Sequence, residues 1–180
     1  MKLTEKMELK NKVQKNSKLV LFFIIYILFF GKSFAQTLDG IYYDWSVFVI
    51  DDLGEEKKCY IASFPKKSIG NYKDSREPYI LITKFQNRGN EEVSIFSGFE
   101  YKIGSDIYIS VDGKQYTLFT NNDIAWAKTK QQDKEIIEDM LDGIAIKVRA
   151  ESSKAEYVVD EYSLKGITRA YKRMRELCKK

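Results

Sequence analysis

The chain contains no histidine, and this absence removes several kinds of chemistry. Without imidazole there can be no Ser-His-Asp or Cys-His nucleophile system, no histidine metal ligand and no histidine pH switch. The chain also lacks a glycine-rich phosphate loop, a serine nucleophile elbow and a cysteine-pair redox motif. The sequence therefore predicts a protein that is not an enzyme, with no catalytic residues, no cofactor and no bound metal ion.

No apolar run is long enough to form a membrane-spanning helix, which needs about 20 residues. The longest run, Leu19 to Phe30, has twelve residues. It follows a lysine-rich segment, Met1 to Lys18, and precedes the small residues Ser33 and Ala35. This arrangement predicts a signal peptide over residues 1–35, cleaved between Ala35 and Gln36. The alternative is an uncleaved membrane anchor.

Removal of the signal peptide changes the charge of the protein. Residues 1–35 hold seven lysines and two glutamates, so their net charge is +5. The whole chain has a formal net charge of +4, so residues 36–180 carry 4 − 5 = −1. The basic character of the whole chain therefore belongs to the targeting segment and predicts no nucleic-acid partner. The remaining residues, 36–180, have the length of a single domain.

Both cysteines, Cys59 and Cys178, lie in the part of the chain that is predicted to be exported. An oxidising compartment favours a disulfide between them, which would fasten the C-terminal element to the start of the fold. The alternative is a pair of free thiols too far apart to be bridged.

Most of the exported part has the pattern of β-strands. Residues 39–50 predict one strand, followed by a turn at residues 51–54, and residues 58–63, 79–85 and 93–97 predict further strands. Residues 68–78 show no apolar periodicity and predict an irregular loop. The clearest signal is Asp112-Gly113, which favours a type I′ hairpin turn between residues 107–111 and 116–118.

Two segments instead have helical spacing. Residues 133–142 place apolar side chains on one face and end before Gly143, and residues 166–178 repeat the pattern with Cys178 on the apolar side. A further strand pair is expected at residues 144–150 and 157–164. Trp45 and Trp126 are predicted to be packing residues. The basic face of the second helix is predicted to be solvated; it comprises Arg169, Lys172, Arg173 and Arg175.

The order of short signatures along the chain resembles the invasion-associated locus B protein family of Gram-negative bacteria. The most specific piece is the stretch from Asp160 to Tyr171, which reads DEYSLKGITRAY. The other pieces are Asp44 to Val47, Cys59 to Lys67, Glu77 to Ile80, Glu92 to Ser94, Gly98, Tyr101-Lys102, Gly104-Ser105, Ala125 to Ala127, Asp133, Met140 and Gly143.

The resemblance implies a mostly β fold, an immunoglobulin-like antiparallel β-sandwich with the two short helices at about 133–142 and 166–178. It also implies export to the periplasm or the outer surface, an association with entry into host cells, and no catalytic residues. Many similar proteins have a further cysteine where this chain has Val49. Only the pair of Cys59 and Cys178 is therefore left for a disulfide.

The leading hypothesis is an exported, non-enzymatic protein that binds another protein or an envelope component, with a host-cell surface as a further candidate. The periplasm is the expected location, with outer-membrane association or secretion as alternatives. After cleavage no spanning segment is expected. The candidate contact surfaces are residues 68–76 and the edge strands. The alternative function is a periplasmic envelope-maintenance or stress factor without host contact, and a third hypothesis is a carboxylate hydrolase.

Overall fold

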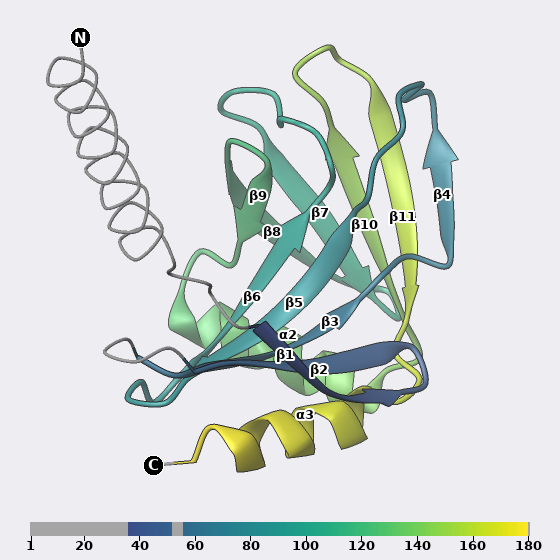
Figure 1. The fold of residues 1–180 in the computed structure, drawn as a ribbon. Helices are drawn as coiled ribbons and strands as arrows, with labels where there is room; N and C mark the ends of the chain where they lie inside the picture. Colours follow the sequence, from purple (N-terminus) through teal and green to yellow (C-terminus); the bar gives the residue numbers. More distant parts are fainter. Residues whose placement is uncertain (1–35, 52–55, 180) are drawn as a thin grey trace, which may run out of the picture. The chain divides into compact units, whose positions relative to one another are not determined.

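The structure, a computed structural model, describes residues 36–51 and 56–179 (Figure 1). The predicted signal peptide, residues 1–35, and most of the predicted turn at 51–54 lie outside the described residues. The described parts of the chain contain eleven strands and two helices. These are β1 (Gln36–Tyr42), β2 (Trp45–Ile50), β3 (Lys58–Ser63), β4 (Lys67–Gly70), β5 (Tyr79–Phe85), β6 (Glu91–Phe96), β7 (Asp106–Val111), β8 (Lys114–Asn121), β9 (Ile124–Trp126), α2 (Lys130–Asp142), β10 (Ala145–Glu151), β11 (Tyr157–Ser163) and α3 (Ile167–Leu177).

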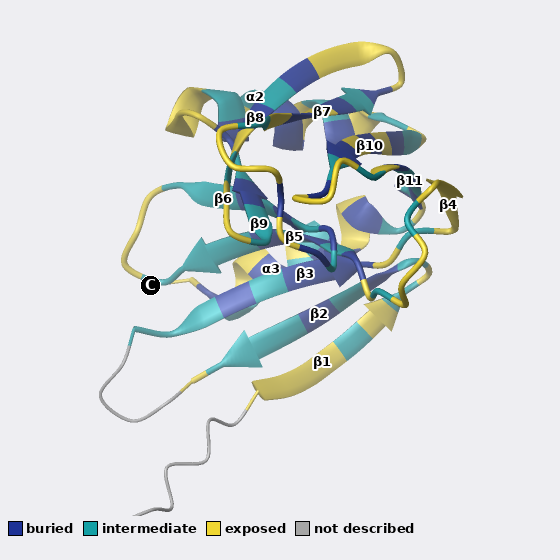
Figure 2. Ribbon diagram, turned by 90° about the horizontal axis from the view of Figure 1, so that it is seen from above, coloured by how far each residue is buried: buried dark blue, intermediate teal, exposed yellow. Residues whose placement is uncertain are grey.

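All eleven strands belong to one antiparallel sheet with the order β1-β2-β3-β5-β6-β9-β8-β7-β10-β11-β4. The sheet bends so that its inner face and the two helices enclose a single hydrophobic core. Helix α3 covers β2 and β3, and helix α2 lies against β6. The prediction of a mostly β, sandwich-like fold with two short helices is confirmed. The two edge strands, β1 and β4, are largely exposed (Figure 2).

Strand alternation decides which side chains reach the core. In β7 the side chains of Ile107, Ile109 and Val111 are buried, whereas the intervening positions face solvent. The predicted hairpin follows this strand. Asp112 and Gly113 have φ values of 46° and 99°, as a type I′ turn requires, and they connect β7 to β8. This hairpin prediction is confirmed.

Both predicted helices are present with small changes at their ends. Helix α2 begins at Lys130, three residues before the predicted start, because the Thr129 hydroxyl accepts a hydrogen bond from the backbone N–H of Gln132 at 3.1 Å and caps the helix. Helix α3 follows Gly166, whose φ is 95°. A Cβ atom at this position would lie 2.0 Å from the carbonyl oxygen of Tyr42, so only glycine fits.

Two predictions from local sequence are wrong in detail. Residues 39–50 form two antiparallel strands, since the chain reverses at Tyr43, which has a φ of 57°. Within the predicted loop at 68–78, residues up to Gly70 complete β4 and pair with β11. On the basic face of α3, by contrast, Arg169, Lys172 and Arg175 are exposed as predicted. Arg173 on the same face forms a bidentate ion pair with Asp39 of β1 at 2.8 Å.

A disulfide joins Cys59 of β3 to Cys178, the residue that caps the end of α3. Both cysteines are fully buried, and they are 119 positions apart in sequence. The bond therefore holds the last helix against the sheet that it covers. Cross-linking of a loop this long restricts the unfolded chain more than the folded one.

We expect the double variant Cys59→Ser, Cys178→Ser to be less stable than the wild type by about 4 to 5 kcal/mol in the chain-entropy model, less any strain in the native bond. Urea denaturation of the protein would measure the difference. The wild type in reducing buffer is the matched control and should unfold at the same urea concentration as the variant. Equal midpoints for the oxidised wild type and the variant would contradict the expectation.

A buried ion pair fixes the connection between β4 and β5. Asp160 of β11 points into the core, where its carboxylate accepts two hydrogen bonds from Arg76, one of them at 2.7 Å to Oδ2. The same carboxylate accepts a hydrogen bond from the Ser68 hydroxyl of β4 at 2.6 Å. Arg76 also donates to the backbone carbonyl of Ser97 at 3.0 Å, just after β6. One carboxylate therefore links β11, β4, the loop before β5 and the end of β6.

The substitution Arg76→Ala should destabilise the protein by about 3 to 5 kcal/mol, because it leaves the buried carboxylate of Asp160 without its charged partner. The control is Lys154→Ala, which breaks the exposed ion pair between Lys154 and Asp74 at 3.5 Å and should cost less than about 0.5 kcal/mol. Chemical denaturation of both variants measures the two losses. Similar losses would mean that Arg76 is no more important than a surface charge.

Candidate binding surface

The outer face of the sheet, opposite the core, is open to solvent across β7, β10 and β11. Its side chains occupy the exposed positions of the alternating strands. Strand pairing places Arg149 of β10 directly between Tyr108 of β7 and Val159 of β11. Val159 in turn pairs with Ile69 of β4, so one row crosses four strands. Tyr157 lies on the same face of β11, two residues before Val159.

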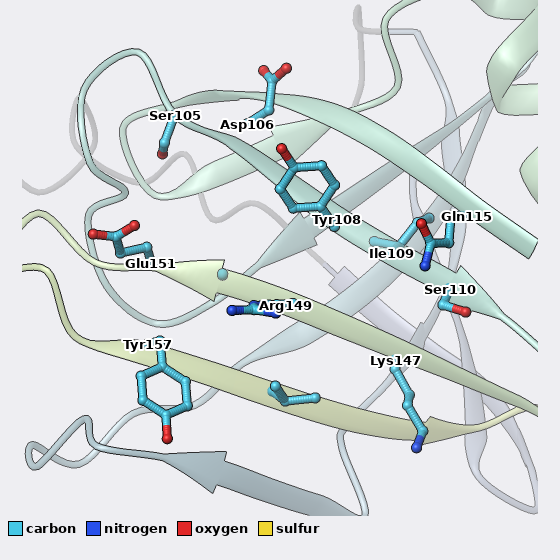
Figure 3. Close-up of a pocket in the computed structure, with 12 residues that line it drawn as sticks. Ser105, Asp106, Tyr108, Ile109, Ser110, Gln115, Lys147, Arg149, Glu151 and Tyr157 are labelled. Atoms are coloured by element: carbon cyan, nitrogen blue, oxygen red, sulfur yellow. The ribbon is translucent and has the colours of Figure 1, made fainter. Parts of the chain in front are cut away.

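This row borders a broad groove of about 630 Å³, which we call the Arg149 groove. Figure 3 shows Arg149 between Tyr108 on one side and Tyr157 on the other. The two tyrosines are 56% and 49% exposed. The groove is lined by Ser105, Asp106, Tyr108, Ile109, Ser110, Gln115, Lys147, Arg149, Ala150, Glu151, Tyr157 and Val159.

The charges in the Arg149 groove are unequally paired. Lys147 forms an ion pair with Glu161 at 3.2 Å, and Asp106 forms one with Lys128 at 2.5 Å. Within residues 36–51 and 56–179, by contrast, the guanidinium of Arg149 has neither an ion pair nor a hydrogen bond. The groove therefore presents one uncommitted cation between two exposed aromatic rings.

The polar groups of the groove do not form an acid-base pair. The hydroxyl of Ser105 donates to the carbonyl of Lys102 at 2.7 Å, and the carboxylate of Asp106 is held by Lys128. No side chain in the groove combines a nucleophile with a neighbouring base. Tyrosine and arginine, however, are the residues that most often dominate protein–protein interfaces.

A second hollow lies on the same face, where β8, β9 and the start of α2 meet. Phe119 and Trp126 are cross-strand neighbours with ring centroids 5.7 Å apart and planes inclined by 26°. The hollow beside them has a volume of about 530 Å³, and we call it the Trp126 hollow. It is lined by Asn90, Glu92, Phe119, Asn121, Trp126, Ala127, Lys128, Thr129, Lys130 and Asp133.

Asp133, in the first turn of α2, is the most perturbed carboxyl group in this hollow. Burial raises its pKa to about 6, the hydrogen bond from the backbone N–H of Val93 opposes the rise, and the charge of Glu92 adds to it. The bond from Val93 is 2.8 Å long and joins α2 to β6. Glu92 is itself held by Arg88 at 3.2 Å. Asp133 therefore connects the helix to the sheet.

The residues that the sequence predicted to be important lie in different parts of the fold. Cys59 and Cys178 lie in the core, away from both hollows. Gln36 begins β1, and Ala35, on the other side of the predicted cleavage site, lies outside the described residues. Trp45 is fully buried as predicted, but Trp126 is only partly buried and lines a hollow, so its prediction as a core residue is wrong in part.

The sequence did not predict that the side chains at the centre of the Arg149 groove form a surface site. Tyr108, Arg149 and Tyr157 each occupy the solvent side of an alternating strand. A bulky aromatic ring at a position that normally carries a polar residue was the available signal. The candidate contact loop at 68–76 is partly internal, because Arg76 is buried.

Over residues 36–51 and 56–179, no helix has the length and apolar character needed to cross a membrane. The same residues contain no cluster of three or more histidine, cysteine, aspartate or glutamate side chains that could hold a metal ion.

The substitution Asp133→Asn should stabilise the protein at pH 7. A folded pKa of about 6, above the unfolded value near 3.8, means that the folded state binds the proton more tightly, so this group makes stability fall as the pH rises from about 4 to 6. Asparagine still accepts the bond from Val93 but carries no charge, so a gain of about 1 to 2 kcal/mol is expected at pH 7.

Urea unfolding of the wild type, Asp133→Asn and the control Asp142→Asn at pH 4.5 and pH 7 would measure this effect. Asp142 is exposed at the other end of the same helix, so its variant should keep the wild-type difference between the two pH values. If Asp133→Asn retained that difference as well, the burial of Asp133 would not be the cause.

Comparison with known proteins places the chain in a family. A search of curated proteins and a search of solved structures find no match. The family model described as Invasion associated locus B (IalB) protein matches residues 45–175, which span β2 to the last turn of α3. This range includes the strands of both hollows and nearly all of the core. The chain therefore belongs to the invasion associated locus B family.

Proposed function

We propose that the protein is an exported, non-enzymatic binding protein of the bacterial envelope that docks a protein partner in the Arg149 groove. The supporting observation is the uncommitted guanidinium of Arg149 between the exposed rings of Tyr108 and Tyr157. The partner is a protein segment that carries a carboxylate close to an apolar or aromatic side chain. The carboxylate pairs with Arg149, and the apolar group covers the two rings.

The proposal is supported because the side chains of the groove can gain binding free energy while losing little conformational entropy. The groove is built on paired strands, so its side chains start from a fixed backbone. Tyrosine has few rotatable bonds and loses little entropy when it is covered. An arginine can bind a carboxylate through two parallel hydrogen bonds. Enclosed acid-base chemistry, in contrast, would require convergent groups that the groove does not offer.

Export is supported by the family and by the N-terminal sequence. The family description names invasion, an activity directed outside the cell. The segment before Gln36 combines a basic start, a short apolar block and small residues, as a secretory signal does. The proposed location is the periplasm, with outer-membrane association or secretion depending on where the partner lies. Nucleic acid is an unsuitable partner, since residues 36–180 carry a net charge of −1.

The test is photo-crosslinking in the producing bacterium, with a photoreactive amino acid at Gln115 on the rim of the groove. The same probe at Lys172, an exposed position on α3, is the control. We expect a discrete adduct from position 115 that position 172 does not give. Arg149→Glu should abolish the adduct, because it replaces attraction to a carboxylate by repulsion, whereas Lys172→Glu should leave it unchanged.

Affinity for the crosslinked partner then measures the contribution of each side chain. Arg149→Ala and Tyr108→Ala should each weaken binding by about ten-fold or more, the effect expected of a dominant interface residue. Thermal unfolding would confirm that both variants are folded. An adduct that forms equally at positions 115 and 172, or that survives Arg149→Glu, would overturn the proposal.

A further inference from the structure

The Trp126 hollow has the features of a small-molecule site independent of the Arg149 groove. Phe119 is 42% exposed, and its ring continues the surface of Trp126. The two rings come from neighbouring strands of one sheet, so their relative orientation is fixed by the backbone. Together they form an aromatic platform at the base of a hollow of about 530 Å³.

Polar side chains surround this platform, and several are uncommitted. Among the residues that the structure describes, the side chains of Asn90, Asn121 and Lys130 make no hydrogen bond and no ion pair. Asn90 and Asn121 each offer one carbonyl acceptor and two N–H donors, and Lys130 offers donors only. The rim therefore presents both donors and acceptors around an apolar floor.

The charges of the rim are mixed and mostly paired. Lys128 is bound to Asp106, and Glu92 is bound to Arg88. The hollow consequently has no strong field of one sign that would select a phosphate, a nucleic acid or a metal cation. A purely apolar ligand would leave the uncommitted amides without partners, which carries a cost in free energy.

A pyranose ring meets both requirements of this hollow. When its substituents are equatorial, its faces consist of C–H bonds whose slight positive charge is attracted to the negative face of an aromatic ring. Its hydroxyl groups point outward in the ring plane and can both donate and accept hydrogen bonds, as the amides and the ammonium of the rim require. An aromatic surface with a few placed polar groups around it is a usual composition of small-molecule sites.

We propose that the Trp126 hollow binds an oligosaccharide of β-linked glucose-type units. One sugar ring stacks on the Phe119–Trp126 platform, and its hydroxyl groups bond to Asn90, Asn121 and Lys130. The site does not depend on the Arg149 groove for any of these contacts. It therefore goes beyond the proposed protein-binding function, and either one can fail while the other holds.

Tryptophan fluorescence provides a selective measurement. The chain has only two tryptophans, and Trp45 is fully buried, so a ligand at the surface can perturb Trp126 alone. The exported domain with its disulfide intact is titrated with cellotriose and with N-acetylchitotriose. The open-chain alcohol mannitol, which has hydroxyl groups but no ring face, is the negative probe.

We expect a saturable fluorescence change with at least one of the two trisaccharides, at a dissociation constant of about 0.1 to 1 mM, and none with mannitol. Phe119→Ala should weaken binding by about ten-fold or more, since it removes half of the platform. Tyr108→Ala in the Arg149 groove should leave the affinity unchanged. Calorimetry on Trp126→Ala and Trp126→Phe should show loss and retention of binding, respectively.

Folding of each variant is checked by its thermal transition, and Trp126→Phe guards against loss of binding through misfolding. Absence of a saturable change with both trisaccharides up to about 10 mM would overturn the proposal. So would an equal response to mannitol, or an affinity that Phe119→Ala leaves unaltered. The crosslinking result at position 115 is independent of all these outcomes.

Discussion

The buried carboxylate of Asp160 holds together the edge of the sheet formed by β11 and β4 and the segment that leads to β5. It lies in the core on β11 and receives hydrogen bonds from Ser68 of β4 and from Arg76. A buried carboxylate is costly unless it is fully paired, and this one is paired from two separate segments. The pairing fixes β4 beside β11, and it anchors the chain that leads from β4 to β5. Ser68 is also the cross-strand partner of Asp160, so this hydrogen bond lies within the pairing of β4 with β11.

This dependence explains why the most specific part of the family signature is structural. In the stretch from Asp160 to Tyr171, the side chains of Tyr162, Leu164, Ile167 and Ala170 are buried, and Gly166 is the position where no Cβ fits. These residues set the path from β11 into α3. Tyr108, Arg149 and Tyr157, in contrast, lie outside every signature piece. The buried residues of this stretch therefore belong to the scaffold, whereas the three side chains at the centre of the Arg149 groove are recognised by their exposed positions on the strands.

The sequence predicted those parts of the fold that local chemistry decides. Asp112 and Gly113 tolerate positive φ, and their hairpin is where it was expected. The apolar spacing of α2 and α3 located both helices to within a few residues. The reversal at Tyr43 could not be predicted in this way, because a tyrosine with a φ of 57° carries no turn signal. It is held by its surroundings, including the backbone bond from Asp44 to the carbonyl of Lys165 at 3.2 Å.

The candidate sites were less predictable than the fold, because each depends on strands that are distant in sequence. The surroundings of Arg149 depend on the pairing of β10 with β7 and β11. Those of Trp126 depend on the pairing of β9 with β8. A tryptophan in a strand is more often a core residue, and Trp45 follows that rule. Burial depends on what covers a strand, and β9 is covered on one face alone. A three-residue strand is too short for its hydrophobic alternation to show which face is covered.

The two hollows also share a physical boundary. Asp106 lines the Arg149 groove, Lys128 lines the Trp126 hollow, and the two side chains form an ion pair at 2.5 Å. Both residues are exposed, so the pair is weak, and it can be broken and re-formed without disturbing the core. The strands beneath, β7, β8 and β9, are hydrogen-bonded to one another. The two hollows therefore meet at this ion pair, and the contacts proposed for each of them involve neither Asp106 nor Lys128.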